Sequence, residues 1–116
     1  MEGVKALGRR DAKGEKQMEQ LHIGQVTASE NIVQEIVETE DFQVFCMSCV
    51  RRHRSGDWGD IPKDQWIRNN QAARKGGVIV SEYLIPEIFR LGYADRIIVT
   101  TTEERTETRI MFPEDD

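Results

Sequence analysis

The sequence predicts an α+β fold in which two to three N-terminal helices pack on a C-terminal antiparallel meander of three to four strands. Apolar residues recur at helical spacing between residues 30 and 75 and alternate with polar ones after Gly77. The pair Gly76–Gly77 separates the two regions. Helices that precede such a meander bury their apolar faces by covering one face of the sheet.

The N-terminal part begins with a polar segment. Residues 1–20 are expected to form a flexible tail, and residues 21–116 a single domain, because the tail has too few apolar residues to bury. Residues 21–26 are expected to form a short first strand. Thr27-Ala28-Ser29-Glu30 has the form of a capping box, so we expect the first helix to begin there.

Two further helices follow. Thr39-Glu40-Asp41 places acidic residues at the start of the second helix, which Gly56 ends. Asp60 with Pro62 predicts the start of a third helix, which ends at Gly76.

The C-terminal part is rich in Val, Ile, Thr and Tyr, which favour strands. We expect strands over residues 78–83, 96–102 and 106–112, with a hairpin loop between the last two. The segment 84–95 is too apolar for an ordinary loop. It is expected either to fold back over the sheet as a lid or to form an exposed contact patch for a partner.

Composition limits the class of protein. The chain has 116 residues, enough for one domain, and no apolar stretch near the roughly 18 residues that a membrane-spanning helix needs. Cys46 and Cys49 are its only cysteines, so no disulfide framework is expected. We therefore expect a cytoplasmic protein with no membrane partner.

The net charge of −5 conceals a segregation of charge along the chain. Residues 21–50 carry five acidic and no basic side chains, and residues 76–116 carry nine acidic against four basic. Residues 51–75 carry seven basic against three acidic. The basic island offers a surface for nucleic acid, whereas the acidic stretches 30–41 and 103–116 offer a carboxylate surface that could occupy another protein's nucleic-acid channel.

Cys46, Cys49 and His53 share one stripe of the second helix with two phenylalanines. Three ligands are one short of a structural zinc site, and apolar neighbours favour packing in the core. We expect no metal and no cofactor.

His53 is also the candidate proton-transfer group of a metal-independent ribonuclease. The neighbouring sheet could supply Ser81, Thr101 and Arg105 to hold and stabilise the phosphate while the histidine moves protons. The alternative is a histidine at a helix end, partly buried and hydrogen-bonded.

The candidate binding residues fall in three groups: the basic residues of the island, Asp57 and the two tryptophans within it, and the apolar insert. Two tryptophans near the basic residues could stack on bases. The loop and its aromatic could instead fix the chain locally. These residues are Arg51, Arg52 and Arg54 with Lys63, Arg68, Arg74 and Lys75, then Asp57, Trp58 and Trp66, then Ile88, Phe89 and Tyr93.

From residue 21 onward the sequence resembles a family of short plasmid- and phage-borne bacterial proteins, described as "plasmid-related protein" or as type I restriction endonuclease subunit M. The residues that carry the resemblance are Gly24-Gln25-Val26-Thr27, Arg52-His53-Arg54-Ser55-Gly56-Asp57-Trp58-Gly59, Asn69 or Asn70, Ser81, Tyr83, Thr101, Arg105, Thr108 and Pro113-Glu114. The family usually has a short hairpin where this chain carries the apolar insert. The restriction-subunit description implies nothing here, because 116 residues cannot hold a methyltransferase domain.

The resemblance implies an accessory protein of a mobile element. We expect it to act by binding, as an anti-CRISPR or anti-restriction factor that occupies a host defence protein or nucleoprotein complex. A second hypothesis is the ribonuclease, supported by a fainter architectural similarity to ribonucleases of the barnase and RelE kind. A third is a small homodimeric structural or regulatory protein.

Overall fold

The computed structural model describes residues 20–89 and 91–115. The tail expected at residues 1–20 lies outside the described residues, apart from Gln20. The described elements, in chain order, are β1 (Gln25–Ala28), α1 (Glu30–Glu38), α2 (Phe42–Arg54), α3 (Lys63–Lys75), β2 (Ile79–Leu84), the 3-10 turn η2 (Glu87–Phe89), β3 (Arg96–Thr101) and β4 (Glu107–Met111).

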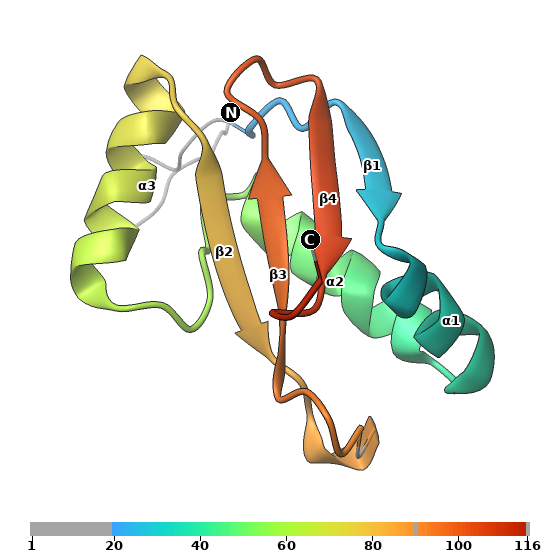
Figure 1. Ribbon diagram of the computed structural model, residues 1–116. Coiled ribbons are helices and arrows are strands. Elements are labelled where there is room, and N and C mark those ends of the chain that lie inside the picture. Colours follow the sequence, from blue (N-terminus) through green and yellow to red (C-terminus); the bar gives the residue numbers. More distant parts are fainter. Residues whose placement is uncertain (1–19, 90, 116) are drawn as a thin grey trace, which may run out of the picture.

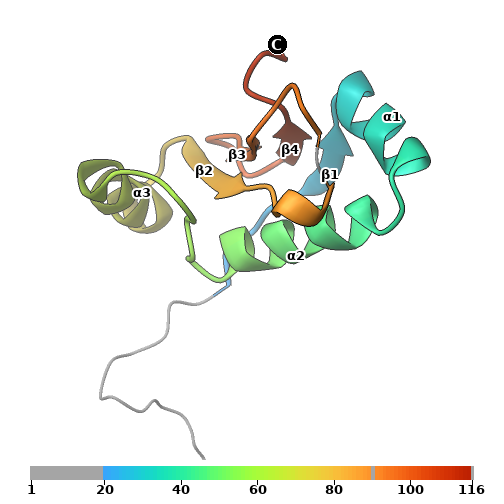
Figure 2. The ribbon, with the colours of Figure 1, turned by 90° about the horizontal axis from the view of Figure 1, so that it is seen from below.

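The strands form one four-stranded sheet in the order β1-β4-β3-β2 (Figure 1). The predicted meander is confirmed, because β2 pairs antiparallel with β3 and β3 with β4. The fourth strand, β1, pairs parallel with β4, so the sheet is mixed rather than wholly antiparallel. The helices lie on one face and beside the two edges of this sheet (Figure 2), and the α+β fold class is as the sequence predicts.

The three helices take different positions around the sheet. Figure 2 shows α2 running under one face, α3 beside β2 and α1 beside the opposite end of the sheet. Residues that alternate along β2, β3 and β4 are buried on the side of α2 and half-buried on the other. One helix therefore covers the face, whereas the sequence led us to expect all helices there.

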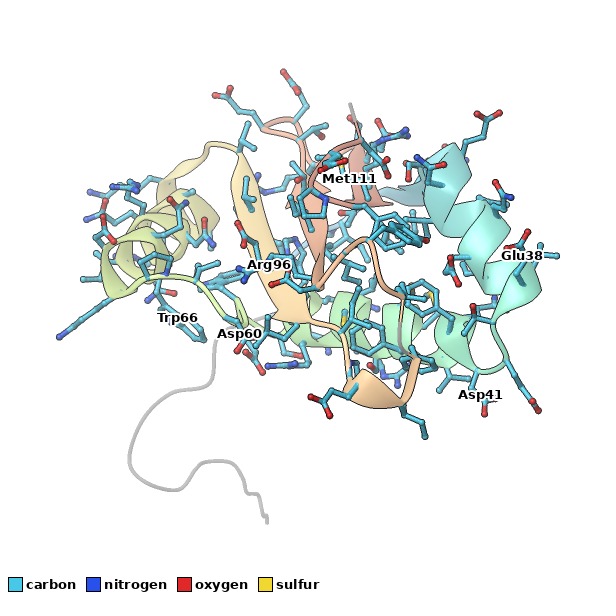
Figure 3. All side chains as sticks on the ribbon, turned by 60° about the horizontal axis from the view of Figure 1, so that its bottom comes forward. Glu38, Asp41, Asp60, Trp66, Arg96 and Met111 are labelled. Carbon is cyan, nitrogen blue, oxygen red and sulfur yellow. The ribbon has the colours of Figure 1, made fainter. Side chains whose placement is uncertain are left out.

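The face of the sheet that lies away from α2 carries both polar and apolar side chains. Arg96 and Met111 lie on it (Figure 3), and the Arg96 guanidinium is 2.9 Å from the Glu82 carboxylate. Ile98 pairs with Met111 in the register of β3 and β4. This face is half-exposed and carries ion pairs, which suits a surface in contact with water.

The helix starts differ from the predicted ones. Ser29, not Thr27, caps α1, and its Oγ accepts the Ile32 amide at 3.3 Å. Thr27 belongs to β1, where it pairs with Arg109. The Asp60 carboxylate does not cap α3 either; it accepts the Leu84 amide at 3.0 Å instead. In both cases pairing with the distant C-terminal strands determines the local role.

The apolar insert divides between the core and the surface. Phe89 packs edge-to-face on Phe42 of α2, with ring centroids 5.4 Å apart, and also contacts Phe45. Ile88 is 81% exposed and Tyr93 is 61% exposed. The insert therefore folds back onto the beginning of α2 through Phe89, and presents Ile88 and Tyr93 outward.

Candidate functional site

Three of the four hypothetical ribonuclease residues, His53, Ser81 and Thr101, lie together at the centre of the fold. His53, in the last turn of α2, points between β2 and β3. Its Nδ1 is 2.6 Å from Ser81 Oγ, and its Nε2 is 2.8 Å from Thr101 Oγ1. The sheet register alone brings the two hydroxyls to the same face, because Ser81 pairs with Val99, two residues before Thr101. The sequence suggests these residue types for one site, and the sheet register supplies their mutual geometry.

The cluster extends beyond the predicted residues. Thr101 Oγ1 is 2.6 Å from Thr108 Oγ1, which donates to the Ile23 carbonyl at 2.8 Å. A carbonyl oxygen can only accept a hydrogen bond, so the Thr108 hydroxyl donates its single proton to Ile23. The Thr101 hydroxyl must therefore donate to Thr108 Oγ1. His53 then donates from Nε2, and its Nδ1 accepts from Ser81. One arrangement of protons satisfies every hydrogen bond in this series. We call the series the His53 relay; its members are Ser81, His53, Thr101, Thr108 and the Ile23 carbonyl.

The relay is closed to solvent. His53, Ser81, Thr101 and Thr108 are each 0% exposed, and the Trp58 ring lies edge-on to the imidazole at 5.5 Å between centroids. Burial, with the positive charge of Arg105 as a smaller cause, lowers the pKa of His53 to about 4. The imidazole is therefore neutral at physiological pH and holds two strands to α2.

Arg105, the expected phosphate-stabilising group, is engaged elsewhere. It stands in the β3–β4 hairpin with φ 61, and its guanidinium donates to the carbonyls of Gly77 at 2.7 Å, Thr102 at 3.0 Å and Ala72 at 2.8 Å. These bonds join the end of α3 and the approach to β2 to the hairpin. The arrangement assigns the guanidinium a structural position between three segments.

The loop after His53 is fixed by its own side chains. Asp57 accepts from Arg52 Nε at 2.8 Å, and its carbonyl accepts the Tyr83 hydroxyl at 2.7 Å. Partial burial raises the pKa of Asp57, but bonds from Arg52 and the Gly59 amide outweigh it and hold that pKa below its usual range. Arg52 also lies over the Tyr83 ring at 4.8 Å. Asp57 and Arg52 thus bind one another and the sheet.

Trp58 and Gly59 complete the same loop. Trp58 is 0% exposed and donates from Nε1 to Asn70 at 2.9 Å, so its ring is not available to stack on a base. Gly59 has φ 79, and a Cβ there would lie 2.1 Å from the Glu82 carbonyl. Main-chain bonds from this loop run along the outer edge of β2. The His-x-Ser-Gly-Asp-Trp-Gly segment is therefore a structural unit.

The edge of β2 is also closed by α3. Asn69 is 1% exposed. Its side-chain Nδ2 donates to the Val80 carbonyl at 2.7 Å, and its Oδ1 accepts from the Val80 backbone amide at 3.4 Å. A side chain here takes the place of a neighbouring strand. The family resemblance leaves Asn69 and Asn70 as alternatives and does not indicate the bonds to Val80.

The basic island is dispersed in the structure. Arg51 and Arg54 are exposed at the end of α2, whereas Trp66 is half-buried against Leu21 and Ile79. Along α3, Arg68 and Lys75 line a shallow hollow of about 490 Å³. The structure does not place either tryptophan as an open stacking platform beside these cations.

The first acidic stretch and the C-terminal end of the second meet at the opposite side of the molecule. A hollow of about 550 Å³ lies between the start of α1, the end of the insert and the segment after β4. A second hollow of about 320 Å³ along α1 shares Asn31 and Tyr93 with it. We call the two together the acidic hollow. Its carboxylates are Glu35, Glu38, Asp95, Glu114 and Asp115. Its described lining includes neither Lys nor Arg, but the Arg96 guanidinium reaches Asp95 from beside it at 3.1 Å.

The sequence indicated the two acidic stretches but not their meeting. Asp115 accepts from Ser29 Oγ at 2.5 Å, Asn31 Nδ2 at 2.8 Å and the Phe112 amide at 3.0 Å. The first two of these bonds bring residues more than 80 positions apart into contact. No periodicity or local motif signals such a pairing.

The predicted packing of both cysteines in the core is confirmed: Cys46 and Cys49 are each 0% exposed. Among residues 20–89 and 91–115, no three His, Cys, Asp or Glu side chains are grouped as metal ligands, and no helix is long and apolar enough to cross a membrane. No protein-family model, curated protein or solved structure matches this chain.

Proposed function

We propose that this chain is an accessory protein of a plasmid or phage that acts by binding in the bacterial cytoplasm. Its acidic hollow and the acids around it would occupy the nucleic-acid site of a host defence protein or nucleoprotein complex. The observation that carries this proposal is the meeting of Glu35 and Glu38 with Glu114 and Asp115 in one hollow. The resemblance to mobile-element proteins supports the biological setting.

A binding role is favoured over catalysis by the state of His53. A ribonuclease needs its proton-transfer groups within reach of the 2′-hydroxyl and the phosphate. Here both imidazole nitrogens are hydrogen-bonded inside the relay, and no side-chain atom of the relay is exposed. The residue types that suggested cleavage instead connect α2 to the sheet.

The acidic hollow suits a nucleic-acid site because such sites are rich in Lys and Arg that neutralise phosphates. A surface of carboxylates attracts the same side chains and competes for them. The apolar insert adjoins the hollow through Tyr93 and could add contact area.

The test is competition for DNA on purified CRISPR effector and restriction complexes. The chain should release labelled DNA from its target, measured by fluorescence anisotropy. A variant with Glu35→Gln, Glu38→Gln and Glu114→Gln should lose at least about ten-fold in potency, because each exposed charge at an interface contributes up to about 1 kcal/mol. The control carries Glu103→Gln and Glu104→Gln, which lie at the other end of the sheet in the β3–β4 hairpin, and should compete nearly as well.

Two results would contradict the proposal. In the first, the acidic variant and the hairpin control compete equally well. In the second, the chain cleaves RNA in EDTA and His53→Gln abolishes the cleavage, which would establish the ribonuclease. Sedimentation of the free chain tests the third hypothesis, because a homodimer that buries Ile88 would dissociate in Ile88→Asp.

A further inference from the structure

We infer that the acidic hollow binds the guanidinium group of an arginine side chain from the partner protein, stacked on the ring of Tyr93. This inference rests on the proposed function and names the chemistry of the partner at that site.

The first support is the shape of the site. The larger hollow has a volume of about 550 Å³, within the range of pockets that hold a side chain or a small ligand. Phe112 is 3% exposed and forms part of its lining. The Tyr93 ring stands edge-on to Phe112 at 5.4 Å, which supports it from one side. The ring remains 61% exposed, so a planar group can lie against it.

The second support is the orientation of Tyr93. Its hydroxyl donates to the Glu35 carboxylate, which anchors the ring at the boundary between the two hollows. Partial burial and then the bond to Glu35 raise the pKa of Tyr93 to about 12, and the charges of Glu38 and Asp115 add to the effect. The hydroxyl therefore stays protonated, and the field around the ring is negative.

The third support is the complementarity of charge. The carboxylates of the hollow come from three separate segments, and of these Asp95 is paired with the Arg96 guanidinium at 3.1 Å. Asp115 is held in place by three donors, so its charge does not have to be ordered when a cation arrives. A cation that enters between these groups gains attraction from several sides at once.

Arginine fits this site better than lysine. A guanidinium is planar, stacks on an aromatic face and forks toward two carboxylate oxygens, whereas an ammonium is a compact and strongly hydrated charge. Tyr93 offers the face, and Glu114 offers carboxylate oxygens in the same lining. The oxygens of Glu35 already accept from Tyr93 and Thr39, so Glu35 contributes its negative charge. Nucleic-acid sites carry arginine abundantly, so the same chemistry would direct the chain to such sites.

The experiment titrates the isotope-labelled full chain with three capped tripeptides, acetyl-Gly-X-Gly-amide, in which X is arginine, lysine or citrulline. Citrulline keeps the planar shape and removes the charge. In the NMR spectrum, the arginine peptide should shift the amides of residues 92–95 and of Asn31 in a saturable way. Lysine should bind more weakly by about three-fold or more, and citrulline should leave the spectrum unchanged. Equal shifts with citrulline, or shifts scattered over the chain, would overturn the inference.

Three variants test the residues. Tyr93→Leu should weaken the arginine peptide by about ten-fold, whereas Tyr93→Phe, which keeps the ring, should bind within about two-fold of the original chain. Glu103→Gln removes the same type of charge from the β3–β4 hairpin, away from the hollow, and should not change binding. Equal affinity of Tyr93→Leu and the original chain would refute the stacking role. Because Tyr93 is largely exposed, these variants should fold, which their spectra verify.

The two proposals fail separately. If the acidic variant loses competition for DNA while no arginine peptide binds, the proposed function stands and the arginine site is refuted. If the arginine peptide binds at residues 92–95 while the chain never competes with DNA, the site stands and the proposed function is refuted.

Discussion

Lowering the pH from about 7.5 to about 5 should reduce the free energy of unfolding by about 2 kcal/mol through His53 alone. Burial, and to a smaller extent Arg105, lowers the pKa of His53 from 6.5 to about 4 in the folded chain. Between these values the unfolded chain binds a proton that the folded chain does not. The stability is therefore complete above pH 6.5 and falls as the pH decreases toward 4, with a full difference of about 3 kcal/mol.

The measurement is urea unfolding at a series of pH values, followed by tryptophan fluorescence, since Trp58 is buried. The control is His53→Gln, whose side chain can still donate and accept but does not titrate. Carboxylates with lowered pKa values, such as Asp57 and Asp115, lose their contribution only near or below pH 4, and they are common to both proteins. Parallel stability profiles for the two proteins would refute the account of a sealed, neutral imidazole.

Two further predictions concern packing. Gly59→Ala should lower the free energy of unfolding by more than about 3 kcal/mol, because its Cβ would lie 2.1 Å from the Glu82 carbonyl; Gly92→Ala, with φ +48 and nothing within 4 Å of its Cβ, should cost only about 1 kcal/mol. Similar losses in urea unfolding would contradict the close approach. Burial raises the pKa values of Cys46 and Cys49 to about 12, so Ellman's reagent at pH 8 should react with them only on unfolding, and rapid reaction without denaturant would disprove their burial.

The sequence predicted what depends on local periodicity. The helices and the three C-terminal strands begin and end within a few residues of the expected positions, because apolar spacing and glycines act over one or two turns. The cap of α1 was missed for the opposite reason. Thr27 has the right chemistry for a cap, yet its pairing with Arg109 draws it into β1, and Ser29 takes the role.

The candidate site was predictable in three of its members but not in its setting. The sequence brought His53, Ser81 and Thr101 into one hypothesis, and the structure places them within hydrogen-bonding distance. Their burial depends on how Trp58 and the rest of α2 pack on the sheet, which no spacing reveals. The acidic hollow escaped prediction because its two halves, Asn31 and Asp115, are 84 positions apart.

Each hydroxyl of the His53 relay has a fixed role as donor and acceptor, and this limits which amino-acid substitutions its positions tolerate. Replacing Thr108 by valine would leave the Thr101 hydroxyl without an acceptor, and replacing Ser81 by alanine would strand the imidazole lone pair; each orphaned group costs about 1 to 3 kcal/mol in the interior. Exchanging all partners together for apolar side chains of matching shape avoids that penalty. Divergence at these positions should therefore proceed in blocks, with intermediate combinations folding less well than either end state.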